Sequence, residues 1–329
     1  MRSPILLAVL VLCRIATPTA TQAEKAKSVP QVGYLSPAVG ADYDPTKDLL
    51  RAAFLDGLRE LGYVEGKNIH VEFREPEKPE ELDEMAADLV NRKVDIIATG
   101  GAAKAMDAAR RATSTIPIVI LACDRADRLV ASIARPGGNI TGMSCISSDL
   151  APKRLQLLQD ALPGLSRVSV LFNGSEPAKV EEFRELQAAA KIKGLELRSA
   201  EVRDPSGFAS AFTAIKGENT QALLTLSDPL THEHVKEIAR LAAEQHLPSM
   251  YGFRELCDEG GLLCYGTNLQ REFRRYGYFI DKILKGTRPG DIPIEEPTSY
   301  ELIINARTAK LLGLSIPPSV LISADEVIE

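Results

Sequence analysis

A four-residue segment, Thr99-Gly100-Gly101-Ala102, follows an apolar run and precedes a stretch with helical spacing. A helix that begins directly after a strand leaves its first backbone N–H groups free, and the positive end of its dipole lies at the same place. Such groups suit a carboxylate or another anion. The segment is therefore a candidate anion site, and the alternative is that its two glycines only form a tight turn. Neither GxGxxG nor GxxxxGK[ST] occurs in the sequence, so no specific pattern indicates a nucleotide.

Asp124 and Asp228 also come just after apolar runs. Either could hold an ammonium group, because a carboxylate that is removed from water needs a cationic partner. The alternatives are structural: Asp228 would initiate a turn with Pro229, and Asp124 would pair with a nearby arginine. An ammonium site facing the anion site would suit an amino acid.

Five further residues complete the candidate ligand-binding set. Ser36, Asn173 and Ser227 are polar side chains at the ends of apolar runs. Tyr251 and Tyr265 each combine a flat apolar face with a polar tip, which could form a floor for a ligand ring or stem. Packing in a hydrophobic core is the alternative for both tyrosines.

Nothing in the sequence favours catalysis. The patterns GxSxG and SxxK are absent, and no histidine is placed where it could serve as a base for a serine at the end of a strand. His232 and His234 lie on a polar stretch, where two adjacent metal ligands would lack partners, so we interpret them as solvated surface. We therefore expect no enzyme activity, no cofactor and no bound metal.

The elements that position these residues follow a repeating order. From residue 29 onward, short apolar runs alternate with amphipathic stretches, which indicates βαβ units and a parallel sheet. The first half predicts strands at 32–35, 69–73, 94–98 and 118–121, and helices at 50–61, 81–91 and 102–112. The second half repeats the order, with strands at 168–172, 195–198, 222–226 and 248–251, and helices at 180–191, 208–215 and 232–245.

Two such halves predict a cleft between them. Doubly wound sheets bind ligands beyond the carboxyl ends of their strands, and most candidate residues above follow one of these strands or lie near its end. The segment at 264–266, which contains Tyr265, is interpreted as a further loop of this kind. The expected fold class is α/β, with two Rossmann-like doubly wound lobes joined by a hinge.

Composition agrees with an ordinary globular protein. The chain has 329 residues, of which 45% are hydrophobic and 26% charged, and this length suggests about two domains. The net charge of -6, with 39 cationic against 45 acidic residues, argues against nucleic acid as a partner because binding phosphates needs a basic face.

The first 23 residues have the order of a secretory signal. A cationic start at Arg2 is followed by a short apolar run and a small-residue exit, with Ala20 or Ala23 as the last residue of the leader. A buried N-terminal strand is the alternative, and lipid attachment at Cys13 is a variant that Leu12 weakens. Export would permit disulfides among four remaining cysteines without fixing their pairing: Cys123, Cys145, Cys257 and Cys264.

Several segments together resemble one protein family. These are Val32-Gly33-Tyr34-Leu35-Ser36, FLDGLRELGYV at 54–64, ARPGGNITG at 134–142, Pro152-Lys153-Arg154-Leu155, Tyr265-Gly266 with Asn268, and LLGLSIPPSV at 311–320. In order and spacing they resemble the exported ABC-transporter substrate-binding proteins of the tryptophan/phenylalanine-binder type, and the likeness covers nearly the whole mature chain.

The resemblance implies a type I periplasmic-binding-protein fold, an amino acid or similar carboxylate as ligand, and a membrane permease with its ATPase subunit as partners. With it, we expect the 273–284 helix to pack on the first lobe and the 300–304 strand to return to the second. The expected organisation is a signal peptide at 1–23, lobe 1 at 29–145 and 267–290, and lobe 2 at 146–266 and 291–329. The protein itself would be periplasmic or otherwise extracytoplasmic and would not span the membrane.

Two other functions stay open at this point. One is a ligand-sensing module that signals through a partner protein. The other is an enzyme built on two Rossmann-like lobes, although the sequence shows neither a cofactor fingerprint nor a polar triad at the strand ends.

Overall fold

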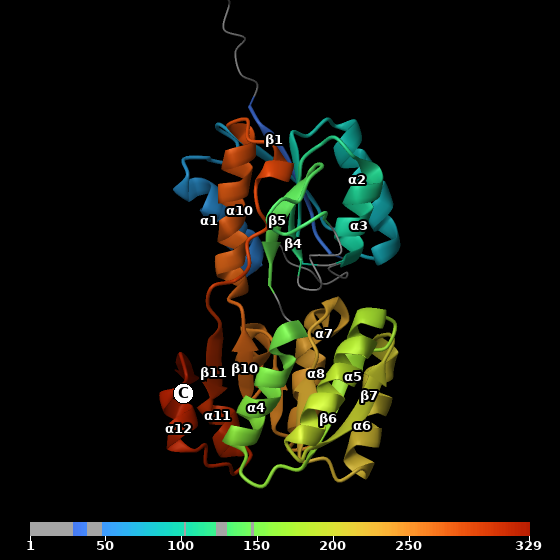
Figure 1. The fold of residues 1–329 in the computed structure, drawn as a ribbon, viewed down its shortest axis with the longest axis vertical. Helices are drawn as coiled ribbons and strands as arrows, with labels where there is room; N and C mark the ends of the chain where they lie inside the picture. Colours follow the sequence, from blue (N-terminus) through green and yellow to red (C-terminus); the bar gives the residue numbers. More distant parts are fainter. Residues whose placement is uncertain (1–28, 38–47, 102, 123–129, 146–147) are drawn as a thin grey trace, which may run out of the picture.

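The computed structural model describes residues 29–37, 48–101, 103–122, 130–145 and 148–329. Its two α/β lobes lie one above the other in Figure 1. The expected signal peptide, Ala102, Cys123 and Asp124 lie outside the described residues, so the expectations for them stay untested.

Lobe 1 is built on a five-stranded parallel sheet in the order β2-β1-β3-β4-β5. The strands are β1 (Gln31–Leu35), β2 (His70–Arg74), β3 (Ile96–Thr99), β4 (Ile118–Ala122) and β5 (Ile140–Ser144). The helices of this part of the chain are α1 (Leu49–Glu60), α2 (Leu82–Asn91) and α3 (Ala103–Ala112). The fully buried strand β3 shows why this sheet reads as continuous apolar runs: helices cover both of its faces.

Lobe 2 is built on a seven-stranded sheet in the order β12-β11-β10-β9-β8-β6-β7. The strands are β6 (Arg167–Asn173), β7 (Glu196–Val202), β8 (Ala222–Thr225), β9 (Ser249–Tyr251), β10 (Leu263–Gly266), β11 (Glu301–Asn305) and β12 (Glu326–Ile328). The helices are α4 (Ala151–Ala161), α5 (Pro177–Ile192), α6 (Phe208–Gly217), α7 (Pro229–Glu233), α8 (Val235–Glu244), α9 (Arg254–Asp258), α11 (Ala306–Leu311) and α12 (Pro318–Ile322). Strand β11 pairs antiparallel with β10, and β12 follows it on the outer edge.

The repeat seen in the sequence appears as a repeat of topology. In each lobe the second strand lies at one side of the first, and the third, fourth and fifth follow on the other side. This is a doubly wound order, in which the connections reverse direction beside the first strand. The carboxyl ends beside that reversal are where such sheets bind ligands.

The structure corrects three local expectations. The single helix expected at 232–245 is two helices, α7 and α8, which meet at His234. Residues 264–266 belong to strand β10 rather than to a loop after a strand. Strand β5 and helix α4, which the sequence interpretation did not assign, complete the repeat.

Helix α10 (Leu269–Leu284) lies beside α1 on one face of the lobe 1 sheet (Figure 1). The two helices approach most closely at Gly57 and Gly277. A Cβ atom on Gly57 would lie 1.9 Å from the carbonyl oxygen of Arg274, so no larger residue fits between the two backbones. The α10 helix therefore packs on lobe 1, as expected, although its chain arrives from lobe 2.

The chain passes between the lobes three times. The first crossing follows β5, the second lies between β10 and α10, and the third precedes β11. The Thr267 hydroxyl donates to the carbonyl of Cys145 at 3.1 Å, and the Asn268 amide donates to the Glu301 carboxylate at 3.1 Å, so neighbouring crossings are bonded together. Ile292 and Ile294 pack in the lobe 1 cores, which places the third crossing after them rather than at residue 290.

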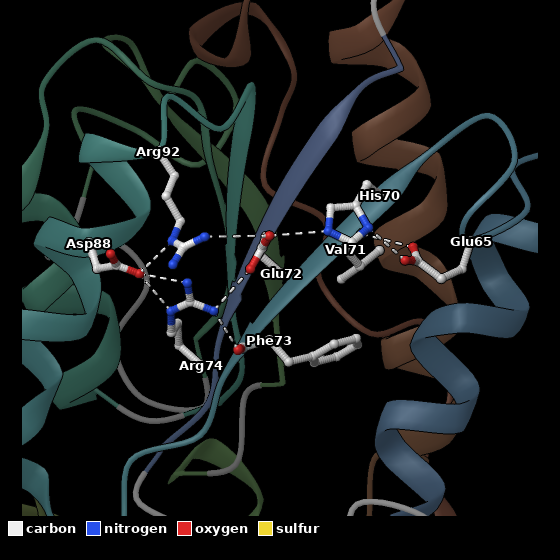
Figure 2. Close-up of polar contacts among 8 residues, drawn as sticks. All are labelled: Glu65, His70, Val71, Glu72, Phe73, Arg74, Asp88 and Arg92. Carbon is white, nitrogen blue, oxygen red and sulfur yellow. Dashed lines mark hydrogen bonds and ion pairs between the residues drawn. The ribbon is translucent and has the colours of Figure 1, made fainter.

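The free edge of the lobe 1 sheet is covered by charged side chains (Figure 2). The backbone N–H of Val71, on edge strand β2, donates to Glu65 Oε2 at 2.8 Å, and Arg74 Nη1 donates to the carbonyl of Phe73 at 2.9 Å. His70 bridges Glu65 and Glu72, at 2.9 and 3.1 Å. Edge strands with unpaired backbone groups invite pairing with other chains, and these contacts occupy such groups.

Disulfide bonds do form within the fold. Cys257 on α9 is bonded to Cys264 on β10, with their Cα atoms 6.0 Å apart, and Cys145 is disulfide-bonded as well. The pairing that the sequence left open is thereby settled for Cys257 and Cys264.

Candidate functional site

A cavity of about 120 Å³ lies between the two lobes. Its walls come from strand-end segments of both lobes and from the start of α10, so neither lobe forms it alone. This interlobe cavity is lined by Tyr34, Ser36, Pro37, Asp48, Leu50, Gly100, Gly101 and Leu121 of lobe 1, by Ser227, Asp228, Pro229, His232 and Phe253 of lobe 2, and by Leu269 and Phe273 of α10. Ligand pockets usually measure roughly 300–1,000 Å³, so this cavity is small for a ligand pocket.

Asp228 is the buried carboxylate of the interlobe cavity. It follows strand β8 and caps α7: Oδ1 accepts from the Thr231 N–H at 2.8 Å, and the Thr231 hydroxyl accepts from the Asp228 N–H at 3.0 Å. The residue is 8% exposed, and its second oxygen, Oδ2, has no hydrogen-bond partner among the described residues. The helix cap of Asp228 therefore uses Oδ1, and Oδ2 is the oxygen that could bind a ligand.

The surroundings of Asp228 oppose its ionisation. Burial raises the pKa of this carboxyl, while the Thr231 N–H, the Lys179 ammonium and the neighbouring Asn173 amide act in the other direction. Lys179 is itself buried and bonds Glu182 at 3.0 Å, so its charge is already balanced in part. A further cation beside Oδ2 would favour the charged carboxylate, because opposite charge lowers the pKa of an acid.

On the opposite wall, Gly100 and Gly101 precede helix α3 and line the cavity. A Cβ atom on Gly100 would lie 2.4 Å from the hydroxyl of Tyr34, so glycine is needed for this close approach. Gly101 has φ +36°, a backbone conformation that L side chains rarely adopt. Ser36, 5% exposed, lines the same wall. Gly100, Gly101 and Ser36 of the predicted anion site thus lie together on one wall of the cavity, and whether they bind an anion stays a prediction.

Aromatic side chains make up much of the remaining wall. Tyr34 packs against Phe54 with ring centroids 5.0 Å apart, which fixes its ring at the cavity. Phe253 and Phe273, from the segment after β9 and from α10, also line the cavity. These three residues are not among the site residues expected from the sequence. Tyr34 lies two residues before Ser36 and Phe253 two residues after Tyr251, both of which were expected there, and this closeness is the signal that could have found them.

His232 corrects an expectation. Instead of solvated surface, it lines the interlobe cavity, and its Nδ1 atom is buried without a hydrogen-bond partner among the described residues. Its ring contacts Phe253 edge to face, with centroids 5.9 Å apart. His234, in contrast, faces lobe 2, where its Nδ1 bonds the Leu230 carbonyl at 2.9 Å. The missed signal is spacing: His232 lies four residues after Asp228, on the same side of a helical turn.

Four other selected residues do not line the interlobe cavity. Thr99 is buried behind it, with its carbonyl accepting the Tyr276 hydroxyl. Asn173 is buried near Asp228, and its amide oxygen accepts from the Ser175 N–H at 2.9 Å. Tyr251 is fully buried in a lobe 2 core, where burial raises its pKa to about 12. Tyr265 contacts Tyr300 at 6.0 Å between ring centroids and lines a different cavity. Both tyrosines therefore have the packing role that was their alternative.

Within the described ranges, no three His, Cys, Asp or Glu side chains gather as a set that could hold a metal ion. Nor is any helix in these ranges both long and apolar enough to cross a membrane. Neither observation identifies a function.

Known proteins are similar to this chain over most of its length. The family of ABC transporter substrate binding proteins matches residues 43–328. A tyrosine-binding protein of Clostridioides difficile is 27% identical over 273 residues, which cover 82% of this chain and 78% of that protein.

Two solved structures share the fold. An ABC domain in complex with L-Trp from Streptococcus pneumonia, 24% identical, aligns with a TM-score of 0.82 over 92% of this chain and 100% of that chain. The ligand-free, open structure of CD0873 from Clostridium difficile, also 24% identical, aligns with a TM-score of 0.68 over 91% of this chain and 99% of that chain. Both comparisons show a type I periplasmic-binding-protein fold, as the sequence resemblance implied.

Proposed function

Because this chain belongs to the family of ABC transporter substrate binding proteins, we propose that it is the exported solute-binding component of an importer for an α-amino acid. It captures the amino acid in the interlobe cavity and delivers it to a membrane permease that is driven by an ATPase subunit. The observation that carries the proposal is Asp228 Oδ2, a buried carboxylate oxygen without a partner among the described residues, on the wall of a cavity that both lobes build.

The ligand's charged groups fit the two walls. Its ammonium group lies at Asp228 Oδ2, where a charge-assisted hydrogen bond replaces the missing partner. Its carboxylate lies at the Gly100-Gly101 turn that precedes α3, and the Ser36 hydroxyl on the same wall is a donor for it. An α-amino acid carries both charges on one carbon, so it can offer an ammonium group to one lobe and a carboxylate to the other.

The side chain of the ligand is aromatic in this proposal. Tyr34, Phe253 and Phe273 line the interlobe cavity, and aromatic pairs gain from edge-to-face and offset contacts. The relative that binds tyrosine and the structural neighbour that holds L-Trp support the same choice.

Binding drives closure through contacts that exist only when the lobes meet. The ligand bonds one lobe at Asp228 and the other at Gly100-Gly101, so it has a higher affinity for the closed arrangement and shifts the population toward it. The bonded crossings restrict the motion to a hinge. The permease then distinguishes a loaded protein from an empty one by the arrangement of its lobes.

To deliver its ligand in this way, the protein must be located outside the cytoplasm, and it does not need to convert the ligand chemically. We propose removal of the 1–23 segment during export, with lipid attachment at Cys13 as the variant. We also propose that the protein is a binder and not an enzyme. N-terminal sequencing of material from the cell envelope tests the first point, and mass spectrometry of amino acids incubated with the protein tests the second.

Isothermal titration calorimetry with single L-amino acids tests the binding function. We expect at least one aromatic amino acid to bind with one-to-one stoichiometry and to raise the melting temperature. Absence of binding by every amino acid, with the wild-type protein folded, would overturn the proposal.

A further inference from the structure

His232 lines the interlobe cavity but belongs to neither of the two places proposed for the amino and carboxyl groups of a ligand. Its Nδ1 atom is buried and has no hydrogen-bond partner among the described residues. Buried ring nitrogens without a partner are uncommon and costly, so such an atom at a cavity calls for a partner from outside the chain.

The surroundings of His232 restrict what that partner can be. Its ring lies edge to face on Phe253, and Leu269 and Phe273, which offer no polar side-chain atom, line the same cavity. These side chains favour a partner whose polar atom is carried on a largely apolar body. An aromatic ring with one polar substituent has this character.

The position of His232 along α7 indicates which part of the ligand it meets. The His232 N–H donates to the carbonyl of Asp228 at 2.9 Å, so the two residues are one helical turn apart and lie on the same face. Four residues of helix rise by about 6 Å. If the ammonium group binds Asp228, the group at His232 belongs to the far end of the ligand's side chain.

We infer that His232 is a specificity-determining residue, whose Nδ1 accepts a hydrogen bond from a donor on the aromatic ring of the ligand. The inference rests on the proposed function and specifies it: the ligand carries a phenolic O–H or an indole N–H, and phenylalanine, which lacks a donor, is disfavoured. Nδ1 accepts in the tautomer that carries its proton on Nε2. A site built to bond a donor discriminates against an analogue without it, because the buried acceptor is then left unpaired.

The test is calorimetry with L-tyrosine, L-tryptophan and L-phenylalanine on the wild-type protein and His232→Phe. We expect the wild type to bind the better of the first two roughly tenfold or more tightly than phenylalanine, and the variant to reduce that ratio to within about threefold. His232→Gln, whose amide oxygen can accept, should keep part of the preference. His234→Phe is the matched control, since this neighbouring histidine bonds Leu230 instead of the cavity, and it should keep the wild-type ratio.

The outcomes separate this inference from the function on which it rests. Wild-type protein that binds phenylalanine as tightly as the other two, or a folded His232→Phe variant that keeps the wild-type ratio, overturns the role of His232 and leaves amino-acid binding standing. Failure of the wild type to bind any amino acid overturns both. Circular dichroism and melting temperature of each variant establish that it is folded, and His232→Gln supplies the comparison if His232→Phe is not.

Discussion

Replacing Asp228 by asparagine should weaken ligand binding while stabilising the empty protein. The asparagine side chain keeps an oxygen for the Thr231 N–H, and asparagine caps helices about as well as aspartate. The substitution replaces the carboxylate oxygen Oδ2 by a neutral amide NH₂ group. The substitution therefore separates the ligand role of this residue from its role as a cap.

The loss of affinity follows from one charge-assisted hydrogen bond. Such a bond contributes about 1.5–3 kcal/mol, and 1.4 kcal/mol corresponds to a factor of about ten. Calorimetry should thus show affinity reduced by roughly ten- to a hundredfold in Asp228→Asn. Asp228→Ala should lose a similar amount and also about 1 kcal/mol of stability, because the cap of α7 disappears.

The gain in stability follows from the raised pKa of Asp228. An acid whose pKa is higher in the folded state binds more protons there than in the unfolded state, so its contribution to stability falls as pH rises from the unfolded pKa through the folded pKa. At pH 7 the wild type bears this penalty and the asparagine variant does not. We therefore expect Asp228→Asn without ligand to have a higher melting temperature than the wild type at pH 7, and the difference to disappear as the pH is lowered.

The pH dependence of binding gives an independent measurement. Below the pKa of Asp228 the wild type must lose a proton to bind an ammonium group, so its affinity should fall as pH decreases. The affinity of Asp228→Asn should change less over the same range. Charged groups around Asp228 include Lys179 and Glu233, which both proteins retain. Because burial and the Asp228 charge raise the pKa of Glu233 to about 7, the difference between the two profiles reports on Asp228 together with its effect on Glu233.

A second aspartate offers a matched control. Asp204 also precedes a proline, and its Oδ1 caps a helical turn by accepting from the Ser206 N–H at 2.9 Å, but it is exposed and does not line the interlobe cavity. Asp204→Asn should leave both affinity and pH profile unchanged. The reasoning is refuted if Asp228→Asn binds the amino acid as tightly as Asp204→Asn does.

Two other substitutions probe lobe 1. Gly100→Ala should weaken amino-acid binding in calorimetry by about tenfold, because its Cβ displaces the Tyr34 hydroxyl at the cavity; unchanged affinity would contradict this packing. The pKa of His70 is raised in the folded protein, first of all by its hydrogen bond to Glu65. This hydrogen bond therefore stabilises the fold fully below about pH 6.5, the pKa of an unfolded histidine, and its contribution is lost as the pH rises through the pKa of His70 in the folded protein. Glu65→Ala should therefore lower the melting temperature more at pH 5.5 than at pH 8 and, by freeing the Val71 N–H, promote association in light scattering.

Most of the fold could be predicted because its sheets are parallel and buried. Strands such as β3 and β4 are buried along their whole length and almost entirely apolar, and the amphipathic helices between them mark each βαβ unit. The pattern was less informative where pairing is non-local. Strand β10 ends in Gly266, a residue typical of turns. On one side β10 pairs with β9, and on the other with β11, where Cys264 faces Ile303, more than thirty residues further along the chain.

The prediction of one helix across 232–245 was wrong because a separate short helix begins just before residue 232. Asp228 and Pro229 begin a separate short helix with a capping box, and that helix ends at Glu233. The buried positions of α8, Ile238, Ala239 and Ala242, continue the same helical spacing, so periodicity alone does not reveal the break. This short helix is what directs His232 to the cavity.

The candidate site shows which part of function local sequence can predict. The strand-end rule located Ser36, Gly100, Gly101, Ser227 and Asp228, all of which line the interlobe cavity. It could not locate Phe273, because α10 reaches the cavity only through the packing of Gly277 against α1.

Asp228 also explains why one residue can satisfy the demands of both folding and binding. Its Oδ1 is bonded within α7 and fixes the carboxylate in place, while Oδ2 remains buried and unpaired among the described residues. A carboxylate held rigidly by its own helix loses little freedom when a ligand binds, so more of the interaction appears as affinity. The unpaired oxygen lowers the stability of the empty protein, and the ligand restores it. Binding and stability are therefore linked through a single side chain, which is why the asparagine variant should change them in opposite directions.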